Sequence, residues 1–398
     1  MQIAHSQNEK EVIVQSDFLS GLRAYASEET ALDMESCDDA VHFLYPERLI
    51  ENATKFVSGF GGATLYAIKA NPNPSLIKLF WDAGIRRFET ASIREIEMLS
   101  AMLPEAEIYF MHPVKSRRAI ARAYELGVRN FAFDCAEELR KIEEETGHAD
   151  DLRLFLRLHM EQTDALHPLN DKFGVPMQEA PLVLQRMAGF GHKLGVTFHV
   201  GSQCMDPTAY RTALAKVRAI VDQAGVELDA VDVGGGFPVF YPGMEPAPLE
   251  TYFGQINAAL EEFGFSDLDI MCEPGRALVA NAGTVAVRVE MRKSNRLYLN
   301  DGTYGALFDA GISKWPYPLE VISGQGVEVK GEGAKFKFYG PTCDSLDVME
   351  GPFELPDSIE EGDWILFHHL GAYGFAMQTK FNGFYSDTVV SIEAPKAR

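Results

Sequence analysis

Short apolar runs alternate with amphipathic stretches along most of the chain. Eight runs have the length and composition of buried β-strands, and they lie at residues 63–68, 86–90, 107–111, 130–134, 152–160, 194–200, 228–233 and 267–272. Between them, apolar residues recur at helical spacing, at residues 75–81, 116–127, 206–225 and 249–263. Strands that alternate with helices in this way predict a (β/α)8 TIM barrel, and a doubly wound open sheet is the alternative.

The pattern changes after about residue 280. Apolar runs now lie between glycine- and proline-rich turns, at residues 284–289, 296–300, 319–322, 335–339, 364–367 and 388–392, whereas 305–313 and 373–379 are partly helical or irregular. We therefore predict two domains. The barrel spans residues 37–280, and a β-sandwich or β-barrel domain combines residues 281–398 with residues 1–36, whose apolar run at 12–14 is a candidate for an additional strand.

Composition narrows the class of protein. The 398 residues are 46% hydrophobic, which is enough for a large core and, by length, for two domains. The net charge of −22 argues against a nucleic-acid partner, and the lack of a long apolar run argues against a membrane. Five scattered cysteines without a C-x-x-C pair predict neither a zinc site nor a disulfide framework, so we expect no metal and a cytoplasmic location.

Reactive side chains follow the predicted strands at the points where the strands end. Because the active site of a barrel lies at the carboxyl ends of its strands, we expect these side chains to meet. They are Lys69 after the first strand, His199 and Ser202 after the sixth, the glycines at 234–236 after the seventh, and Glu273, Gly275 and Arg276 after the eighth. Taken alone, the lysine is better explained by a surface position, and the glycine triplet is at least as well explained by a tight turn.

Together, these residues have the chemistry that pyridoxal phosphate requires. The cofactor needs a lysine for its aldehyde, a phosphate site and a carboxylate at its pyridine nitrogen. Lys69 meets the first requirement, the glycines and the forked guanidinium of Arg276 meet the second, and Glu273 meets the third. We expect His199 to lie flat against the cofactor ring.

The ordered motifs resemble one family over residues 40 to 393. They are YAIKANPNP, FETAS, DKFGVP, FHVGSQC, DVGGGFP, CEPGRALVA, LNDGTYG, GPTCDSLD, GDWILF, GAYGFAM and FNGF. They are similar to those of the fold-III pyridoxal-phosphate decarboxylases of basic amino acids, and most similar to the ornithine and lysine decarboxylases. The resemblance implies decarboxylation of L-ornithine to putrescine, in polyamine biosynthesis, with lysine or another diamino or larger amino acid as the alternative substrate.

The resemblance also implies roles for individual residues. Lys69 would bind the cofactor as a Schiff base, Glu273 would pair with the pyridine nitrogen, and His199 would stack on the ring. The remaining cofactor residues would be Ser202, Gly235, Gly236, Gly275, Arg276 and Tyr373 around the phosphate, with Glu89, Arg157 and Lys172 nearby. Cys343 matches the residue that returns a proton to the substrate, and Asp344 matches the carboxylate for its distal amine. In this family both come from the partner subunit, which implies a homodimer with shared active sites.

The segment after LNDGTYG departs from the family pattern. Ornithine decarboxylases usually carry a second aspartate for the distal amine there, but without a gap Ser313 falls at that position. Asp309 lies a few residues earlier and serves if the loop is shortened; otherwise the distal contact is water-mediated or changed. Asp309 and Tyr304 are therefore further candidates for contact with the substrate.

Two other functions are compatible with the same scaffold. A racemase or epimerase would need a protonating residue, usually a tyrosine, on the opposite face of the cofactor, and the GPTCDSLD segment favours decarboxylation instead. A non-catalytic regulatory relative would have lost the cofactor lysine or the site cysteine. Lys69 and Cys343 are both present, which argues for an enzyme.

Overall fold

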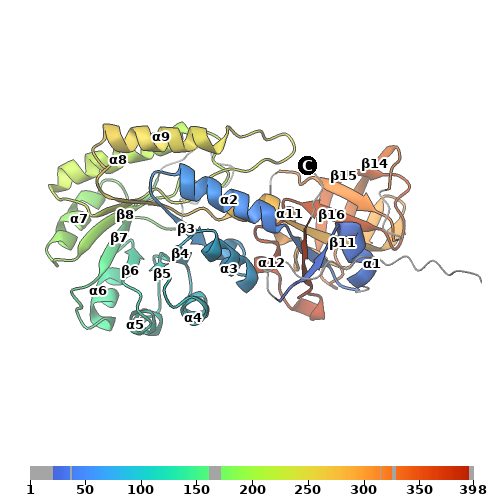
Figure 1. Ribbon diagram of the computed structural model, residues 1–398, viewed down its shortest axis with the longest axis horizontal. Helices are drawn as coiled ribbons and strands as arrows, with labels where there is room; N and C mark the ends of the chain where they lie inside the picture. The colour runs from blue at the N-terminus through green and yellow to red at the C-terminus, as the bar shows by residue number, and fades with distance from the viewer. Residues whose placement is uncertain (1–20, 36–37, 161–171, 314, 325–328, 394–398) are drawn as a thin grey trace, which may run out of the picture.

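The computed structural model describes residues 21–35, 38–160, 172–313, 315–324 and 329–393, which form two bodies that lie side by side (Figure 1). In the first body, parallel strands close into a barrel in the order β10-β3-β4-β5-β6-β7-β8-β9. They are β3 (Ala63–Ala67), β4 (Arg87–Thr90), β5 (Glu107–Phe110), β6 (Asn130–Phe133), β7 (Arg153–Arg157), β8 (Lys193–Thr197), β9 (Ala230–Asp232) and β10 (Asp269–Cys272). The predicted (β/α)8 barrel is confirmed, with several strands shorter than the apolar runs that indicate them.

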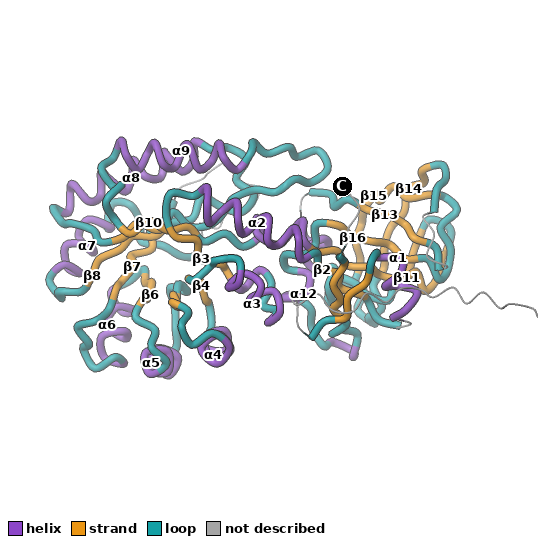
Figure 2. The backbone as a smooth tube through the Cα atoms, in the orientation of Figure 1, coloured by secondary structure: helices purple, strands orange, loops and turns teal. Residues whose placement is uncertain are grey.

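Helices pack around the outside of the barrel and cover its strands (Figures 1 and 2). They are α2 (Pro46–Gly59), α3 (Pro74–Asp82), α4 (Ile93–Met102), α5 (Arg117–Glu125), α6 (Ala136–Glu145), α7 (Ala180–Ala188), α8 (Thr208–Ala224) and α9 (Leu249–Glu262). Polar side chains explain where some of them begin. Asn73 and Ser116 accept hydrogen bonds from the first turns of α3 and α5, and Ser92 with Glu95 forms a capping box on α4. Helices α3, α5, α8 and α9 confirm the predicted ones.

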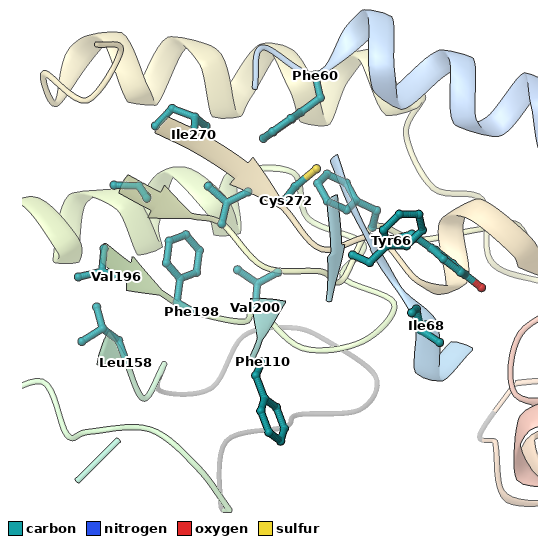
Figure 3. Packing of buried hydrophobic residues seen from close by; sticks show 14 of the residues in the cluster. Phe60, Tyr66, Ile68, Phe110, Leu158, Val196, Phe198, Val200, Ile270 and Cys272 are labelled. Atoms are coloured by element: carbon teal, nitrogen blue, oxygen red, sulfur yellow. The ribbon is translucent and has the colours of Figure 1, made fainter. Parts of the chain in front are cut away.

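Alternation along the strands divides the barrel core into two layers. Side chains such as Tyr66, Phe110 and Val196 belong to one large buried cluster, part of which Figure 3 shows. Their neighbours along the strands point inward and form a separate buried cluster, which consists of Leu65, Tyr109, Met111, Ala132, Phe155, Ala230 and Met271. Because side chains fill the interior, the ends of the strands are where this barrel can build a site.

The second body is rich in strands. Its sheet has the order β1-β17-β2-β11-β12-β14-β15, and β16 pairs with both β11 and β13. The strands are β1 (Arg23–Tyr25), β2 (Val41–Leu44), β11 (Gly283–Lys293), β12 (Arg296–Leu299), β13 (Leu319–Ile322), β14 (Gly333–Tyr339), β15 (Val348–Pro356), β16 (Trp364–His368) and β17 (Val389–Ile392). Strands β11, β12, β13, β14, β16 and β17 confirm the six predicted ones. The short helices are α1 (Glu28–Glu35), α10 (Arg276–Val279), α11 (Phe308–Ile312) and α12 (Gly374–Met377), and the 3-10 turns are η2 (Ile68–Ala70), η3 (Ala280–Ala282) and η4 (Phe381–Gly383).

Three strands of this sheet are not indicated by the sequence pattern. Strand β15 contains Gly351 and Pro352, a pair that is typical of a turn. Proline is tolerated here because β15 is the last strand of the order and pairs only with β14, so the missing N–H breaks no second ladder. Strand β2 lies within the range predicted for the barrel, yet it pairs with β11 and β17. Residues 41–44 therefore belong to the sheet of the second body. The domain limits at residues 36/37 and 280/281 remain a prediction.

The N-terminal segment does contribute to the second body. Strand β1 pairs in parallel with β17, whereas the predicted strand at residues 12–14 lies outside the described residues. Within the described ranges, no helix has the length and apolar character needed to cross a bilayer, and no cluster of His, Cys, Asp or Glu has the arrangement of a metal site.

The loop after β16 ties the second body to the carboxyl end of the barrel. The Gly371 amide donates to the Ala280 carbonyl at 3.1 Å, and the Tyr373 amide donates to the Ala70 carbonyl at 2.8 Å. The Asn71 side chain donates to the Gly371 carbonyl at 2.9 Å. These bonds place the loop against the turn that carries Lys69, and the site lies at this junction.

Candidate active site

A cavity of about 470 Å³ lies at the carboxyl ends of the barrel strands, next to the second body. The barrel contributes Lys69, Glu89, Arg157, His199, Ser202, Gly235, Gly236, Glu273, Gly275 and Arg276 to its wall, and the second body contributes Phe308, Asp309, Ile312, Tyr373 and Met377. The side chains singled out at the strand ends therefore meet, as the barrel topology predicts.

Lys69 lies in η2, directly after β3, and its side chain reaches into the cavity. The turn is held in place because the Tyr66 hydroxyl donates to the Asn71 carbonyl at 2.9 Å. Nζ of Lys69 donates to Glu89 Oε2 at 2.9 Å. Burial acts to lower the pKa of the Lys69 amine, but Glu89 and Glu273 outweigh it and raise the pKa above its ordinary value. In the cofactor-free site the lysine is therefore an ammonium ion.

Glu273 lies directly after β10 and lines the cavity. Its backbone N–H donates to the Gly234 carbonyl at 2.9 Å, which joins the ends of β9 and β10. Its Oε1 is buried without a hydrogen-bond partner. Burial raises the pKa of Glu273, and the nearby Asp232 and Glu89 raise it further. This carboxyl group can therefore hold a proton at a pH where an exposed glutamate would have lost it.

Asp232 is a buried carboxyl group that sequence reasoning missed. It accepts from the Thr197 hydroxyl and from the Gly234 amide, both at 2.9 Å. Burial raises its pKa to about 6. The residue opens the DVGGGFP motif, which is a sequence signal, but at the end of an apolar run nothing distinguishes it from the other residues of the strand.

The glycines after β9 form a loop that accepts no side chains. A Cβ atom at Gly235 would lie 2.7 Å from the Glu273 carbonyl oxygen, and one at Gly236 would lie 2.4 Å from the Gly201 carbonyl oxygen. Gly236 also has φ of 103°, in the left-handed region that favours glycine. The Tyr210 hydroxyl donates to the Gly235 carbonyl at 2.9 Å and fixes the loop. Backbone groups thus line this side of the cavity, together with Ser202.

His199 is held as a neutral imidazole. Its Nδ1 accepts a hydrogen bond from the Gly201 amide at 2.9 Å, so the ring proton is on Nε2. Burial, Arg157 and Lys69 together lower the pKa of His199 to about 3. An uncharged flat ring therefore forms part of the cavity wall.

The cavity wall also includes three residues that the family resemblance singles out, Arg157, Arg276 and Tyr373. The guanidinium of Arg276 is buried and ion-paired with Asp309, and its Cζ lies 4.9 Å from the centre of the Tyr373 ring. Arg157 ends β7, and its Cζ lies 5.5 Å from the ring centre of Phe173. Lys172 contacts the same ring, at 5.0 Å, and is not among the described residues that line the cavity.

A second group of side chains lies outside the described cavity lining. We call it the cysteine group, and it consists of Tyr304, Cys343, Asp344, Phe381 and Asn382. The Cys343 amide and thiol both donate to Asn382 Oδ1, at 3.2 and 3.3 Å. The Tyr304 hydroxyl donates to Asp344 Oδ2 at 2.9 Å, and its ring lies 5.1 Å from that of Phe381. The Leu346 amide and the Tyr304 hydroxyl lower the pKa of Asp344, so its carboxylate is charged and accessible.

Comparison with known proteins gives one consistent family. Residues 47–280 match the model of the pyridoxal-dependent decarboxylases, pyridoxal binding domain. The lysine/ornithine decarboxylase of Selenomonas ruminantium is 33% identical over 341 residues, which are 83% of this chain and 84% of that protein.

Solved structures agree with the family match. A mutant of the lysine decarboxylase SrLDC in complex with PLP has a TM-score of 0.82 at 29% identity, covering 92% of this chain and 94% of that chain. The lysine/ornithine decarboxylase of Vibrio vulnificus, complexed with putrescine, has a TM-score of 0.77 at 27% identity, covering 91% and 97%.

The residues of the cavity fit pyridoxal 5'-phosphate, the cofactor of these proteins. Glu273 offers an unpartnered buried oxygen for a ring nitrogen, and Lys69 offers an amine for the aldehyde. The backbone of Gly235 and Gly236 lines the same cavity as Arg276, where a phosphate group would meet backbone N–H groups and a guanidinium. Pyridoxal 5'-phosphate is therefore the cofactor of this site.

Proposed function

This chain belongs to the pyridoxal-dependent decarboxylases, and we propose that it removes the α-carboxyl group of a basic amino acid. The substrate is L-ornithine, which yields putrescine, or L-lysine, which yields cadaverine. One observation carries the proposal: Lys69, Glu273 and the glycine loop with Arg276 line a single cavity, so the three groups that pyridoxal phosphate requires meet in one site.

The cofactor, when bound, supplies an aldehyde carbon for the substrate amine and a ring that withdraws the electron pair left by departing carbon dioxide. The protein controls the protons around it. Glu273 would face the ring nitrogen with its unpartnered buried oxygen, and its carboxylate would stabilise a proton on that nitrogen. Lys69 holds the aldehyde end, with Glu89 as its hydrogen-bond partner for proton exchange. The neutral ring of His199 covers one face without adding charge.

The cysteine group supplies the remaining chemistry from a second copy of the chain. Cys343 and Asp344 lie apart from the cavity that holds Lys69 within one chain. Exposed apolar side chains lie near them in sequence, with Leu346 at 73% and Phe384 at 41% exposure, as expected of a surface that another protomer covers. We therefore propose a homodimer in which the partner's cysteine group completes each active site.

In that arrangement each member of the group has a task. The ionised Asp344 receives the distal ammonium of the substrate, and Tyr304 fixes the carboxylate that does so. The Cys343 thiol returns a proton to the carbon that lost its carboxyl group. Asn382 orients that thiol, because its Oδ1 accepts from both the amide and the sulfur.

The experiment that tests the function measures carbon dioxide release by the cofactor-loaded protein. Substrates are L- and D-ornithine, L- and D-lysine, arginine, meso-diaminopimelate and 2,4-diaminobutyrate. Preferred turnover of L-ornithine or L-lysine supports the proposal. Absence of release from every substrate, with cofactor bound at one equivalent per chain, would exclude it.

A further inference from the structure

Asp309 is fully engaged by the guanidinium of Arg276. Nη1 of Arg276 donates to Asp309 Oδ2 at 2.8 Å, and Nη2 donates to Oδ1 at 3.1 Å, so the two groups form a bidentate pair. The Tyr317 hydroxyl also donates to Oδ2. Both oxygens of the carboxylate are therefore used by groups of the same chain.

Arg276 is enclosed on its other sides as well. The Tyr241 hydroxyl accepts from Nη1 at 3.0 Å, and the rings of Trp315 and Tyr373 lie 5.3 and 4.9 Å from Cζ. The side chain is 7% exposed, and that of Asp309 is 11% exposed. A buried bidentate pair within such a cage has one orientation, which the carboxylate sets.

That orientation leaves one edge of the guanidinium free. Asp309 takes the edge formed by Nη1 and Nη2, whereas Nε is buried without any hydrogen-bond partner. Arg276 lines the same cavity as Gly235 and Gly236. A phosphate group bound in that cavity would pair with this guanidinium.

The face that α11 turns to the cavity is otherwise apolar. Phe308 and Ile312 both line the cavity from this helix, and Met377 of α12 lies in the same wall. The charge of Asp309 is matched by Arg276, so α11 offers no uncompensated negative charge to a distal ammonium. Without a gap after LNDGTYG, Ser313 falls at the position of the family's second aspartate, and its Oγ is buried and unpartnered.

We propose that Asp309 is a positioning residue: it holds the guanidinium of Arg276 in one orientation at the cofactor's phosphate site, and it does not bind the substrate. Recognition of the distal amine then falls to the single carboxylate of Asp344 from the second copy. This last step rests on the proposed function, whereas the role toward Arg276 rests on the cofactor site alone.

The test compares two ligands that differ only in the phosphate. Cofactor-free protein is titrated with pyridoxal 5'-phosphate and with pyridoxal, for the wild type and for Asp309→Asn, by absorbance and intrinsic fluorescence. We expect the dissociation constant for pyridoxal phosphate to rise roughly tenfold to a hundredfold, the range for loss of charge-assisted hydrogen bonds. The constant for pyridoxal should stay within about twofold, because that ligand does not use Arg276.

A second variant and a double-mutant cycle distinguish a loss of positioning from a general loss of folded protein. Tyr317→Phe removes the hydroxyl that donates to Asp309 and accepts from Nη1 of Arg276 at 3.4 Å, and it keeps the ion pair, so it should weaken pyridoxal phosphate binding by a smaller factor. In an Arg276→Ala background, Asp309→Asn should cause no further loss, since there is no guanidinium left to position. An unchanged affinity in Tyr317→Phe, or an equal loss in both backgrounds, would overturn the proposal.

Other outcomes also decide the question. Tighter binding of pyridoxal phosphate by Asp309→Asn would show that the carboxylate opposes the phosphate by its charge, and would overturn the positioning role. An unchanged cofactor affinity, with a raised KM for lysine and ornithine at saturating cofactor, would make Asp309 a substrate residue. If the protein binds both ligands and releases no carbon dioxide, the proposed function fails while the two dissociation constants still decide the role of Asp309.

Discussion

Nζ of Lys69 and Oε2 of Glu89 lie 2.9 Å apart. Lys69 directly follows β3, and Glu89 lies in β4, the strand that pairs with β3. Burial favours the neutral amine, but Glu89 and Glu273 raise the pKa of Lys69 above its ordinary value. An ammonium ion cannot attack an aldehyde. Glu89 therefore influences the pH at which the lysine can bind its cofactor.

Replacing that carboxylate should move the pH dependence of cofactor binding. In Glu89→Gln the pKa of Lys69 falls, so covalent attachment of pyridoxal phosphate to cofactor-free protein should begin at a lower pH than in the wild type. The measurement is the rate of formation of borohydride-reducible cofactor between pH 6 and 10. Lys69→Ala serves as the control and should show neither attachment nor turnover. Identical pH profiles for wild type and Glu89→Gln would contradict this account.

A single methyl group in the glycine loop should disrupt cofactor binding. The Cβ atom of Gly235→Ala would meet the Glu273 carbonyl oxygen at 2.7 Å and His199 Nε2 at 3.2 Å. We expect a loss of pyridoxal phosphate affinity of roughly tenfold or more, because backbone on both sides has to move. Equilibrium titration checks this.

The matched control is Gly254→Ala, in helix α9, where a Cβ atom meets nothing within 4 Å. It should leave cofactor affinity unchanged and raise stability by about 0.5–1 kcal/mol, since alanine is the better helix former. Should both variants lose cofactor alike, the close approach at Gly235 would not be the cause.

Shared active sites predict complementation between two inactive variants. Lys69→Ala and Cys343→Ala each lack one half of every site, so each homodimer should be inactive. Random mixing of equal amounts gives half heterodimers with one intact site of two, hence roughly a quarter of wild-type activity. The assay is carbon dioxide release after subunits are exchanged and allowed to reassociate. Activity that stays at the level of the separate variants would place Lys69 and Cys343 in the same chain's site.

Asp344 should discriminate substrates by their distal amine. Asp344→Asn removes the charge that we assign to that contact, so KM for lysine and ornithine should rise by roughly tenfold or more. Binding of norleucine, which has the chain but no distal amine, should be unaffected, as followed by the change in cofactor absorbance. A similar loss for lysine and norleucine would show that Asp344 only maintains its loop.

His42 should make the protein less stable in mild acid. It is buried in β2, its Nε2 has no hydrogen-bond partner, and burial lowers its pKa to about 4. The unfolded chain therefore binds more protons than the folded one below about pH 6.5, and stability falls as the pH drops from there to about 4. The full effect is about 3 kcal/mol, at about 1.4 kcal/mol for each unit of pKa.

The measurement is denaturant unfolding of wild type and His42→Gln at pH 7 and pH 4.5. The variant should lose less stability between the two pH values, and other titrating groups cancel in the difference. An equal loss in both proteins would show that His42 is hydrated in the folded state.

The order of strands and helices could be predicted because it is a local property. Apolar runs with turns between them indicate all eight barrel strands, and the glycines and proline-rich turns show where the barrel gives way to the second body. Topology then brings the strand ends together, so Lys69, His199 and Glu273 meet in one cavity without further information. Strand β15 could not be predicted in this way. Its Gly-Pro pair indicates a turn, but an edge strand tolerates Pro352 where a central strand does not.

The sequence by itself therefore determined the barrel and the cofactor, and it predicted which residues lie around that cofactor. Only the tertiary structure decided which of those residues are free to act. Asp309 has the right chemistry for a substrate ammonium, but it is paired with Arg276, thirty-three positions away in the chain. Asp232 looked like part of a strand and is a buried neighbour of Glu273. The charge and hydrogen-bonding capacity of a carboxylate depend on its partners in space. The positions of residues along the chain do not show which partners these are.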